Sequence, residues 1–181
     1  MGAATSSFLP EDNIRMRIAQ EGDVDAIARL INAAFIVERI AFDGDRIDAQ
    51  SVRELLKKGA FLVAEDATGP PVRAELEVPR VDLAGCVYVE VVGERSYLGL
   101  LSVDPRRQGT GLGRPLVAAA EEYSRNARCS AMDLRVISPR AEALVPFYEH
   151  LGYTRTGAAP FPPDVKTKVP CHYILMAKPL T

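Results

Sequence analysis

The order of helical and extended segments predicts an α/β fold with a central mixed β-sheet flanked by helices. Just after Asp23, apolar residues recur at helical spacing, namely Val24, Ile27, Leu30, Ile31 and Ala34. Compact apolar runs at 60–64 and 131–136 have the length of buried strands. Because strands and helices alternate along the chain, we expect one sheet packed between helices.

The remaining elements follow the same alternation. We expect a first strand at 14–19, a short helix at 51–58 that stops at Gly59, two strands at 86–92 and 97–103, and a helix from Gly111 to about Arg125. Further along we expect a helix at 142–150, a strand beginning at 153–157, a proline-rich loop at 161–170 and a last strand at 173–178.

Composition indicates a single domain. The chain has 181 residues, of which 48% are hydrophobic and 25% charged, so it can form a substantial core. We expect residues 1–13 to be a flexible lead-in and 14–181 to form the domain. After the break at 69–71, the segment 72–82 has the character of an insertion, such as an extended hairpin arm.

Charge and cysteine content narrow the class of protein. A formal net charge of −2 gives no sign of a nucleic-acid surface, and no apolar run is long enough for a membrane span. The three cysteines are odd in number and widely spaced, which favours a reduced, cytoplasmic protein. Residues 2–6 match a myristoylation pattern, but a disordered tail explains them more simply. The pair Cys171-His172 has no metal-ligand spacing, so we expect no metal.

The segment 98–116, LGLLSVDPRRQGTGLGRPL, carries most of the functional information. An apolar strand leads into a glycine-rich turn, and the turn leads directly into a helix. Glycine lets the backbone reach positive φ and approach a ligand closely. The start of a helix offers unpaired N–H groups and a positive partial charge. This order of elements therefore predicts a seat for a nucleotide-type pyrophosphate.

Three glycine motifs compete for this turn. A Walker A loop needs Lys followed by Ser or Thr, but Arg114-Pro115 stands there. A dinucleotide fingerprint needs G-x-G-x-x-G, whereas the spacing here is G-x-G-x-G, which disfavours an oxidoreductase even though Asp133 lies at a suitable distance downstream. Gln108, Gly111 and Gly113 satisfy the third pattern, Q-x-x-G-x-G. It resembles the acyl-CoA pyrophosphate loop of the GNAT superfamily of N-acyltransferases.

A second motif strengthens the resemblance. The run from Phe147 to Tyr153, FYEHLGY, is similar to the F-Y-x-x-x-G-[FY] signature that closes the GNAT core. The similarity covers roughly 14–178. One position departs from the pattern, because members often carry Asn seven residues before the tyrosine and Ala141 stands there. Arg140, backbone or water must then replace that contact to the pantetheine arm.

The resemblance implies the layout of the site. In the GNAT fold two central strands splay apart, and the exposed backbone edge of one, here Leu101, Ser102 and Val103, holds the pantetheine arm as an added strand. The pyrophosphate would lie on the residues of the loop and helix start, which are Gln108, Gly109, Thr110, Gly111, Leu112, Gly113 and Arg114. Arg106, Arg107 and Arg114 are candidate charge partners for the phosphates.

The catalytic roles are also implied by the resemblance. Tyr148 would protonate the departing CoA thiolate as a general acid. Two carboxylates are candidates for the base: Glu90, which alternates with Tyr88 on a strand, and Glu38, at the end of the first helix. A chain of water molecules could replace either. The segment 35–48 is too polar for core and, with 161–170, is a candidate acceptor-facing loop.

These observations predict an N-acetyltransferase that moves an acetyl group from acetyl-CoA to a primary amine of a small or amino-acid-like acceptor by direct attack. Acetyl-CoA would be the co-substrate, with no metal. A non-catalytic acyl-CoA-binding sensor or scaffold of the same fold is the alternative. The sequence leaves a homodimer open.

Overall fold

A computed structural model describes residues 14–66 and 83–181. The predicted lead-in at 1–13 and the predicted insertion at 72–82 therefore lie outside the described residues. Within the described ranges, no helix is long and apolar enough to cross a membrane.

One seven-stranded sheet forms the centre of the molecule, in the order β1-β2-β3-β4-β5-β7-β6. Its strands are β1 (Ile14–Ile18), β2 (Ala60–Asp66), β3 (Leu83–Val92), β4 (Arg95–Val103), β5 (Ala131–Ile137), β6 (Thr154–Pro160) and β7 (His172–Pro179). Only β4 and β5 pair in parallel, and the other neighbours are antiparallel. The mixed sheet predicted from the sequence is confirmed.

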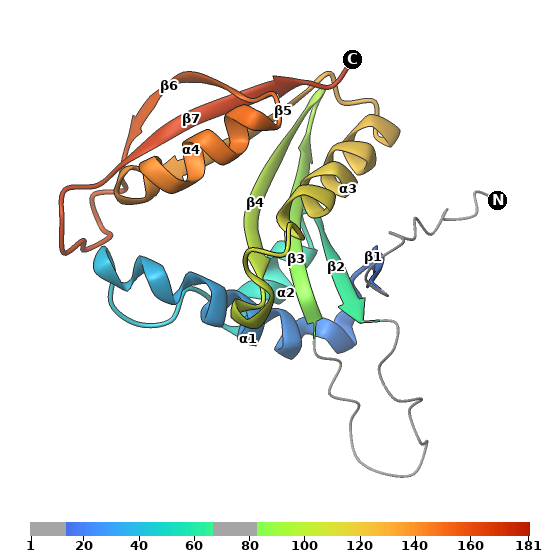
Figure 1. The fold of residues 1–181 in the computed structure, drawn as a ribbon, viewed down its shortest axis with the longest axis horizontal. Coiled ribbons are helices and arrows are strands. Elements are labelled where there is room, and N and C mark those ends of the chain that lie inside the picture. Colours follow the sequence, from blue (N-terminus) through green and yellow to red (C-terminus); the bar gives the residue numbers. More distant parts are fainter. Residues whose placement is uncertain (1–13, 67–82) are drawn as a thin grey trace, which may run out of the picture.

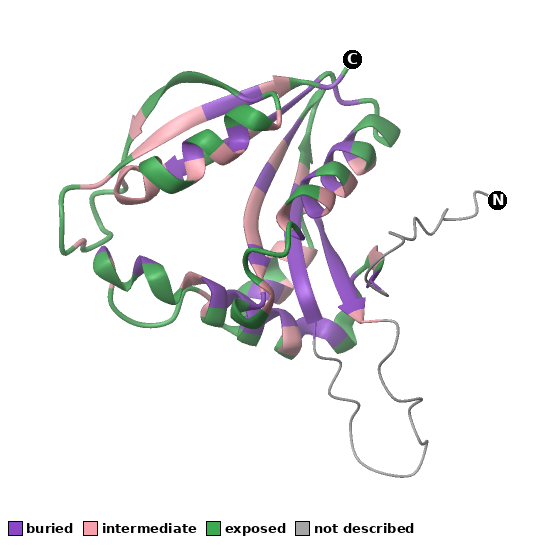
Figure 2. Ribbon diagram, in the orientation of Figure 1, coloured by how far each residue is buried: buried purple, intermediate pink, exposed green. Residues whose placement is uncertain are grey.

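Helices cover both faces of this sheet (Figure 1). The α-helices are α1 (Val24–Ala34), α2 (Ala49–Leu56), α3 (Gly113–Asn126) and α4 (Ala141–His150). One apolar core lies under α1 and α2, with Ile27, Phe61 and Tyr88 at its centre. The other lies under α3 and α4 and includes Leu116 and Tyr153. Figure 2 shows how burial concentrates on β2, β3 and the inner sides of the helices, whereas β6 is largely exposed.

The chain leaves α1 through a short 3-10 helix, η2 (Phe35–Ile40), rather than through an irregular loop. Two residues of the segment 35–48, Glu38 and Ala41, are buried. The prediction that this segment is too polar for the interior is therefore wrong at these two positions, because η2 turns Glu38 inward and Ala41 follows its end, while Ile36, Val37, Arg39 and Ile40 are exposed.

The parallel pair β4 and β5 is joined at one end only. Register partners extend from Arg95 with Ala131 to Tyr97 with Asp133, and the two strands then diverge. A bidentate ion pair, with Arg95 nitrogens 2.6 and 2.7 Å from the Asp133 carboxylate oxygens, fastens the joined end. From residue 98 onward the edge of β4 that faces β5 has no strand partner among the described residues. The splay implied by the family resemblance is thus present.

A bulge marks the same part of β4. Cys86 faces Ser102 and Tyr88 faces Gly99, so one residue of β3 opposes Leu100 and Leu101. Leu100 adopts a φ of 51°, which an L side chain rarely accepts. Such strain is tolerated where packing on both sides imposes it, and it turns the local backbone away from a regular ladder.

The open end of the splay is bridged by the loop between β6 and β7. The Lys168 ammonium lies 2.6 Å from an Asp43 carboxylate oxygen and donates to the Arg39 carbonyl at 3.0 Å. The Phe161 ring stacks on Phe42 with centroids 5.3 Å apart. The two halves of the sheet therefore meet at both ends, with a hollow between them.

Candidate active site

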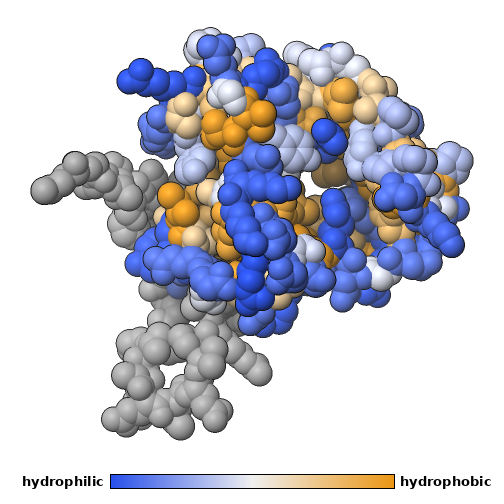
Figure 3. Space-filling model, turned by 180° about the vertical axis from the view of Figure 1, so that it is seen from behind, coloured by the Kyte–Doolittle hydropathy of each residue, from blue (hydrophilic) through white to orange (hydrophobic). Residues whose placement is uncertain are grey.

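The hollow between the two halves is a cavity of about 430 Å³. Its floor comes from the diverging strands, its upper wall from Leu144 and Tyr148 of α4, and its rim from η2, the loop after η2 and the loop between β6 and β7. Figure 3 shows the molecule hollowed here, with hydrophilic side chains around the opening. Both loops predicted to face an acceptor line this cleft.

Tyr148 lies at the inner end of the cleft. It is 7% exposed and packs its ring edge-on against Phe147 and Tyr153, with centroids 5.0 and 5.8 Å away. Its hydroxyl makes no hydrogen bond with any residue of 14–66 or 83–181, and it is not fully enclosed by them, because no fully buried side-chain oxygen of the described residues lacks a partner. Burial, together with the nearby Tyr97 hydroxyl, raises the pKa of Tyr148, so the hydroxyl keeps its proton at neutral pH.

Glu38 is the candidate base that the cleft contains. It projects from η2, is 9% exposed and lies 3.7 Å from the Arg46 guanidinium. Burial raises the pKa of its carboxyl, and this exceeds the opposing attraction of Arg46 and Arg140. A raised pKa brings a carboxylate closer to the range in which it exchanges protons at physiological pH.

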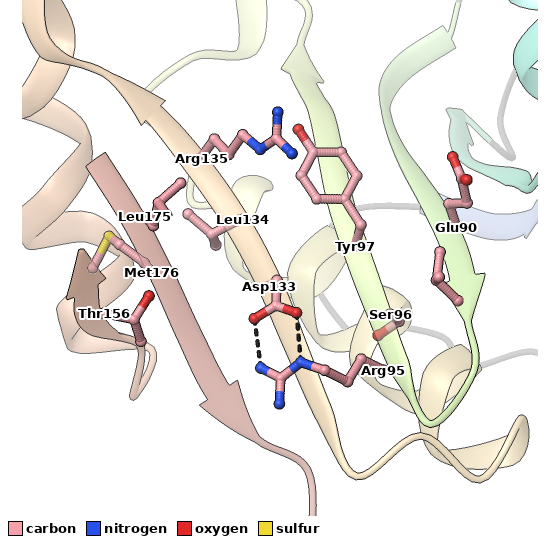
Figure 4. Close-up of a pocket in the computed structure, with 11 residues that line it drawn as sticks. Glu90, Arg95, Ser96, Tyr97, Asp133, Leu134, Arg135, Thr156, Leu175 and Met176 are labelled. Atoms are coloured by element: carbon pink, nitrogen blue, oxygen red, sulfur yellow. Dashed lines mark hydrogen bonds and ion pairs between the residues drawn. The ribbon is translucent and has the colours of Figure 1, made fainter. Parts of the chain in front are cut away.

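Glu90, the other candidate base, lies elsewhere. It lines a second cavity of about 580 Å³ beside β4, β5 and β7 (Figure 4). Its carboxylate accepts a hydrogen bond from the Tyr88 hydroxyl at 3.0 Å. It does not line the cleft that contains Tyr148. The structure therefore brings Tyr148 and Glu38 to one cavity and leaves Glu90 outside it.

The glycine-rich turn between β4 and α3 has the geometry of an anion seat. Gly109 and Gly111 have φ values of 83° and 86°, and a Cβ built on either would point into open space. The backbone N–H groups of Gly109, Gly111, Leu112 and Gly113 donate to no described residue. The helix begins at Gly113, two residues later than predicted, because Gly111 is left-handed.

Side chains around the turn are partly committed to internal contacts. Arg106 is paired with Asp104 and Arg107 with Asp66, whereas Arg114 is exposed at the helix start and has no acidic partner in the described part of the chain. The Gln108 amide donates to the Val103 carbonyl at 3.4 Å and so supports the turn itself. Of the three predicted phosphate partners, Arg114 is the one left available.

The two sequence motifs are in contact. A Cβ on Gly113 would lie 3.2 Å from the Phe147 ring, so the helix start of α3 packs closely against α4. The phenylalanine of the second motif thus fixes where the N–H groups of the turn lie relative to Tyr148. The side chains of Leu101 and Val103 are partly buried against the same core.

Sequence reasoning missed a set of aromatic and cationic side chains in the cleft. The Phe161 ring stacks on Tyr173 with centroids 4.6 Å apart, and the Arg135 guanidinium lies 5.5 Å from the Tyr173 centroid and 5.6 Å from that of Tyr97. Figure 4 shows Arg135 and Tyr97 extending toward each other from β5 and β4. These residues sit far apart in the sequence, and no local pattern connects them.

Comparison with known proteins agrees with this geometry. The model of the acetyltransferase (GNAT) domain matches residues 78–162. The mycothiol acetyltransferase of Propionibacterium freudenreichii subsp. shermanii is 28% identical over 167 residues, which cover 87% of this chain and 49% of that protein. The chain thus spans about half the length of this curated relative.

Solved structures show the same fold. The ribosomal-protein-S18-alanine N-acetyltransferase of Escherichia coli superposes with a TM-score of 0.66 at 17% identity, over 93% of this chain and 94% of that one. The yncA protein of Salmonella typhimurium, solved with its cofactor acetyl-CoA, gives 0.67 at 21% identity, over 94% and 95%. These likenesses show that the chain has the GNAT fold, and with the splayed strands, the glycine turn and the domain match they support a GNAT acetyl-CoA-dependent acyltransferase.

Proposed function

We propose that this protein transfers the acetyl group of acetyl-CoA to the primary amine of a small, amino-acid-like acceptor by direct attack. The observation that carries the proposal is the Tyr148 hydroxyl, which is protonated, free of any described hydrogen-bond partner and belongs to a residue that lines the cavity formed by the diverging strands. A residue kept only for packing would satisfy its hydroxyl within the core.

The described residues fit acetyl-CoA at two places. The free edge of β4 offers backbone groups to an extended pantetheine arm, and the open turn at Gly109 and Gly111 offers N–H groups to a pyrophosphate. Acetyl-CoA supplies the activated acetyl group as a thioester. The bulge at Leu100 turns backbone N–H groups of β4 out of the ladder, where one can donate to the thioester carbonyl oxygen.

The chemistry then needs one proton removed and one supplied. The ammonium of the acceptor must lose a proton before its nitrogen can attack, and Glu38 is the carboxylate in the cleft with a raised pKa. Tyr148 donates its proton to the departing sulfur, which makes a neutral thiol the leaving group.

The cytoplasmic location predicted from the sequence stays a prediction.

The choice between the two candidate bases has a direct test. If Glu38 is the base, activity rises with pH as its carboxyl loses a proton, and burial moves that rise to higher pH than for an exposed glutamate. We expect Glu38→Gln to remove this acidic limb from the kcat/KM profile of the amine, while Glu90→Gln retains it. Profiles of both variants across the range of about pH 4–9 check this, and loss of the limb in Glu90→Gln alone would assign the base to Glu90.

The acceptor side of the cleft has a separate test. Arg46 pairs with Glu38 and its guanidinium lies 5.6 Å from the Phe35 ring centroid, away from the glycine turn. We therefore expect Arg46→Ala to raise KM for the amine and to leave KM for acetyl-CoA within about threefold, since only ground-state binding on one side is lost. Arg114→Ala, at the helix start, should show the opposite pattern. Equal effects of Arg46→Ala on both KM values would contradict the assignment.

The enzyme and sensor hypotheses are separated by an acceptor screen. Purified protein, acetyl-CoA and a panel of primary amines are followed by release of free CoA thiol. The transferase predicts thiol release that depends on the amine. Binding of acetyl-CoA with no thiol release across amino acids, polyamines, amino sugars and N-terminal peptides would favour the sensor.

A further inference from the structure

Arg135 lies on the face of β5 opposite the core under α3 and α4. It projects from β5 just beyond the point where β4 and β5 part, and it lies beside the rings of Tyr97 and Tyr173, 5.6 and 5.5 Å from their centroids. It lines both the cleft and the second cavity. Contacts with the two rings restrict the guanidinium before any ligand binds, so its N–H groups lose little conformational entropy when they donate to a ligand.

The other arginines of the cleft are already neutralised. Arg39 lies 3.6 Å from an Asp45 carboxylate oxygen, and Arg46 lies 3.7 Å from Glu38. Arg135 has no acidic partner within residues 14–66 and 83–181, and Lys166, on the exposed loop between β6 and β7, has none either. At the centre of the cleft one positive charge is therefore left over.

A hydroxyl donor accompanies this charge. Tyr97 stands at the last paired position of β4, lines the same cleft and makes no hydrogen bond through its hydroxyl with the described residues. Arg135 and Arg46 both act on this hydroxyl: burial raises the pKa of Tyr97, and the two arginines oppose that rise. The Arg135 guanidinium lies 5.6 Å from the centroid of the Tyr97 ring, and both residues line the cleft that contains Tyr148.

We propose that Arg135 and the Tyr97 hydroxyl bind a carboxylate of the acceptor, so that the acceptor is an amine that also carries a carboxylate, as an amino acid does. One planar guanidinium and one hydroxyl match the charge and geometry of a single carboxylate. This inference rests on the proposed function, which names the amine but not what else the acceptor must carry.

Opposite charges in the cleft match such a zwitterion. Glu38 provides a carboxyl group at the η2 side, and Arg135 provides a guanidinium at the β5 side, each on a different wall. An acceptor bound between them has its ammonium directed toward Glu38 and its carboxylate toward Arg135. The carboxylate then fixes the orientation of the amine relative to Tyr148. Arg135 is in this sense a specificity-determining residue.

The test compares matched acceptors. Each common L-amino acid is assayed beside its own carboxamide, which keeps the amine and side chain and removes the negative charge. For the best acceptor, we expect wild-type kcat/KM to be about 10- to 100-fold higher for the acid than for the amide, the range of a charge-assisted hydrogen-bonded pair. Arg135→Gln should abolish this preference by lowering kcat/KM for the acid alone, and Arg135→Lys should restore part of it.

Arg95→Gln is the matched control, because Arg95 lies on the same face of the sheet but its charge is taken up by Asp133. It should keep the preference for the acid. Equal use of acid and amide by the wild type, or an equal loss for both in Arg135→Gln, would overturn the inference and leave the acetyltransferase standing.

A separate binding experiment distinguishes failure of the inference from failure of the proposed function. Calorimetric titration of the CoA-loaded protein with the acid and with the amide needs no turnover. Binding of the acid that is lost in Arg135→Gln, but not in Arg95→Gln, supports the inference even if no amine is acetylated. Absence of any acid binding, or binding that Arg135→Gln leaves unchanged, overturns it.

Discussion

Replacing Tyr148 by phenylalanine should lower kcat by about 10²- to 10⁴-fold, the range for a positioned proton donor. The substitution removes one oxygen that makes no hydrogen bond to a described residue, so the core around it should be unaffected. Affinity for acetyl-CoA should stay nearly unchanged, because the hydroxyl acts on the leaving sulfur and not on the bound ground state. Steady-state kinetics and acetyl-CoA titration together measure both quantities.

Tyr123→Phe provides the control. Tyr123 lies on α3, is partly buried against the same core and makes no hydrogen bond through its hydroxyl to the described residues. The Tyr123→Phe substitution removes the same hydroxyl oxygen at a distance from the cleft, so the variant should keep the activity of the wild type. Comparable kcat values for Tyr148→Phe and the wild type would assign Tyr148 to packing alone.

Replacing Gly111 by valine should remove most of the stabilisation that acetyl-CoA gives. A ligand at 100 times its Kd stabilises the folded protein by about 2.7 kcal/mol. At Gly111 the φ of 86° disfavours any side chain, and a Cβ would occupy the open space in front of the free N–H groups. The measurement is the shift of Tm with acetyl-CoA in the wild type and the variant.

Valine at Gly111 strains the backbone as well as blocking acetyl-CoA, so a control variant with backbone strain alone is needed. Gly93 provides it. It sits in the turn between β3 and β4 with a φ of 61° and, like Gly111, would have nothing within 4 Å of an added Cβ. Gly93→Val should therefore lower Tm by itself yet keep the full ligand-induced shift. An undiminished shift in Gly111→Val would mean that the turn does not seat the pyrophosphate.

The sequence was sufficient to predict the parts of the site that depend on local geometry. The left-handed backbone at 109 and 111 favours glycine, and the helix starts directly after it. The conformation of the turn therefore depends on residues that are adjacent in the sequence and could be predicted from them. The packing of Phe147 on Gly113 joins two motifs that are distant in the sequence, and it was not predicted. Strands were predicted within a few residues because apolar runs mark them directly.

The parts that depend on tertiary packing were not predictable. Nothing about leucine indicates the left-handed conformation of Leu100, which the neighbouring strands impose. The burial of Glu38 follows from how η2 packs, and the polar character of its segment predicted the reverse. Tyr97, Arg135 and Tyr173 meet because β7 pairs with β5 and leaves β6, which precedes it in the sequence, at the edge of the sheet.

The wedge-shaped gap that opens where β4 and β5 diverge has a consequence for the order in which the two substrates bind. The walls of the acceptor cleft come from opposite sides of the wedge: Glu38 and Phe42 from the side of β4, and Arg135, Phe161 and Tyr173 from the side of β5. Between the joined end and the rim, no described strand spans the gap. We expect an acyl-CoA arm that lies along β4 to fill that gap and to set the spacing of the two walls, so acetyl-CoA should bind first and the amine second.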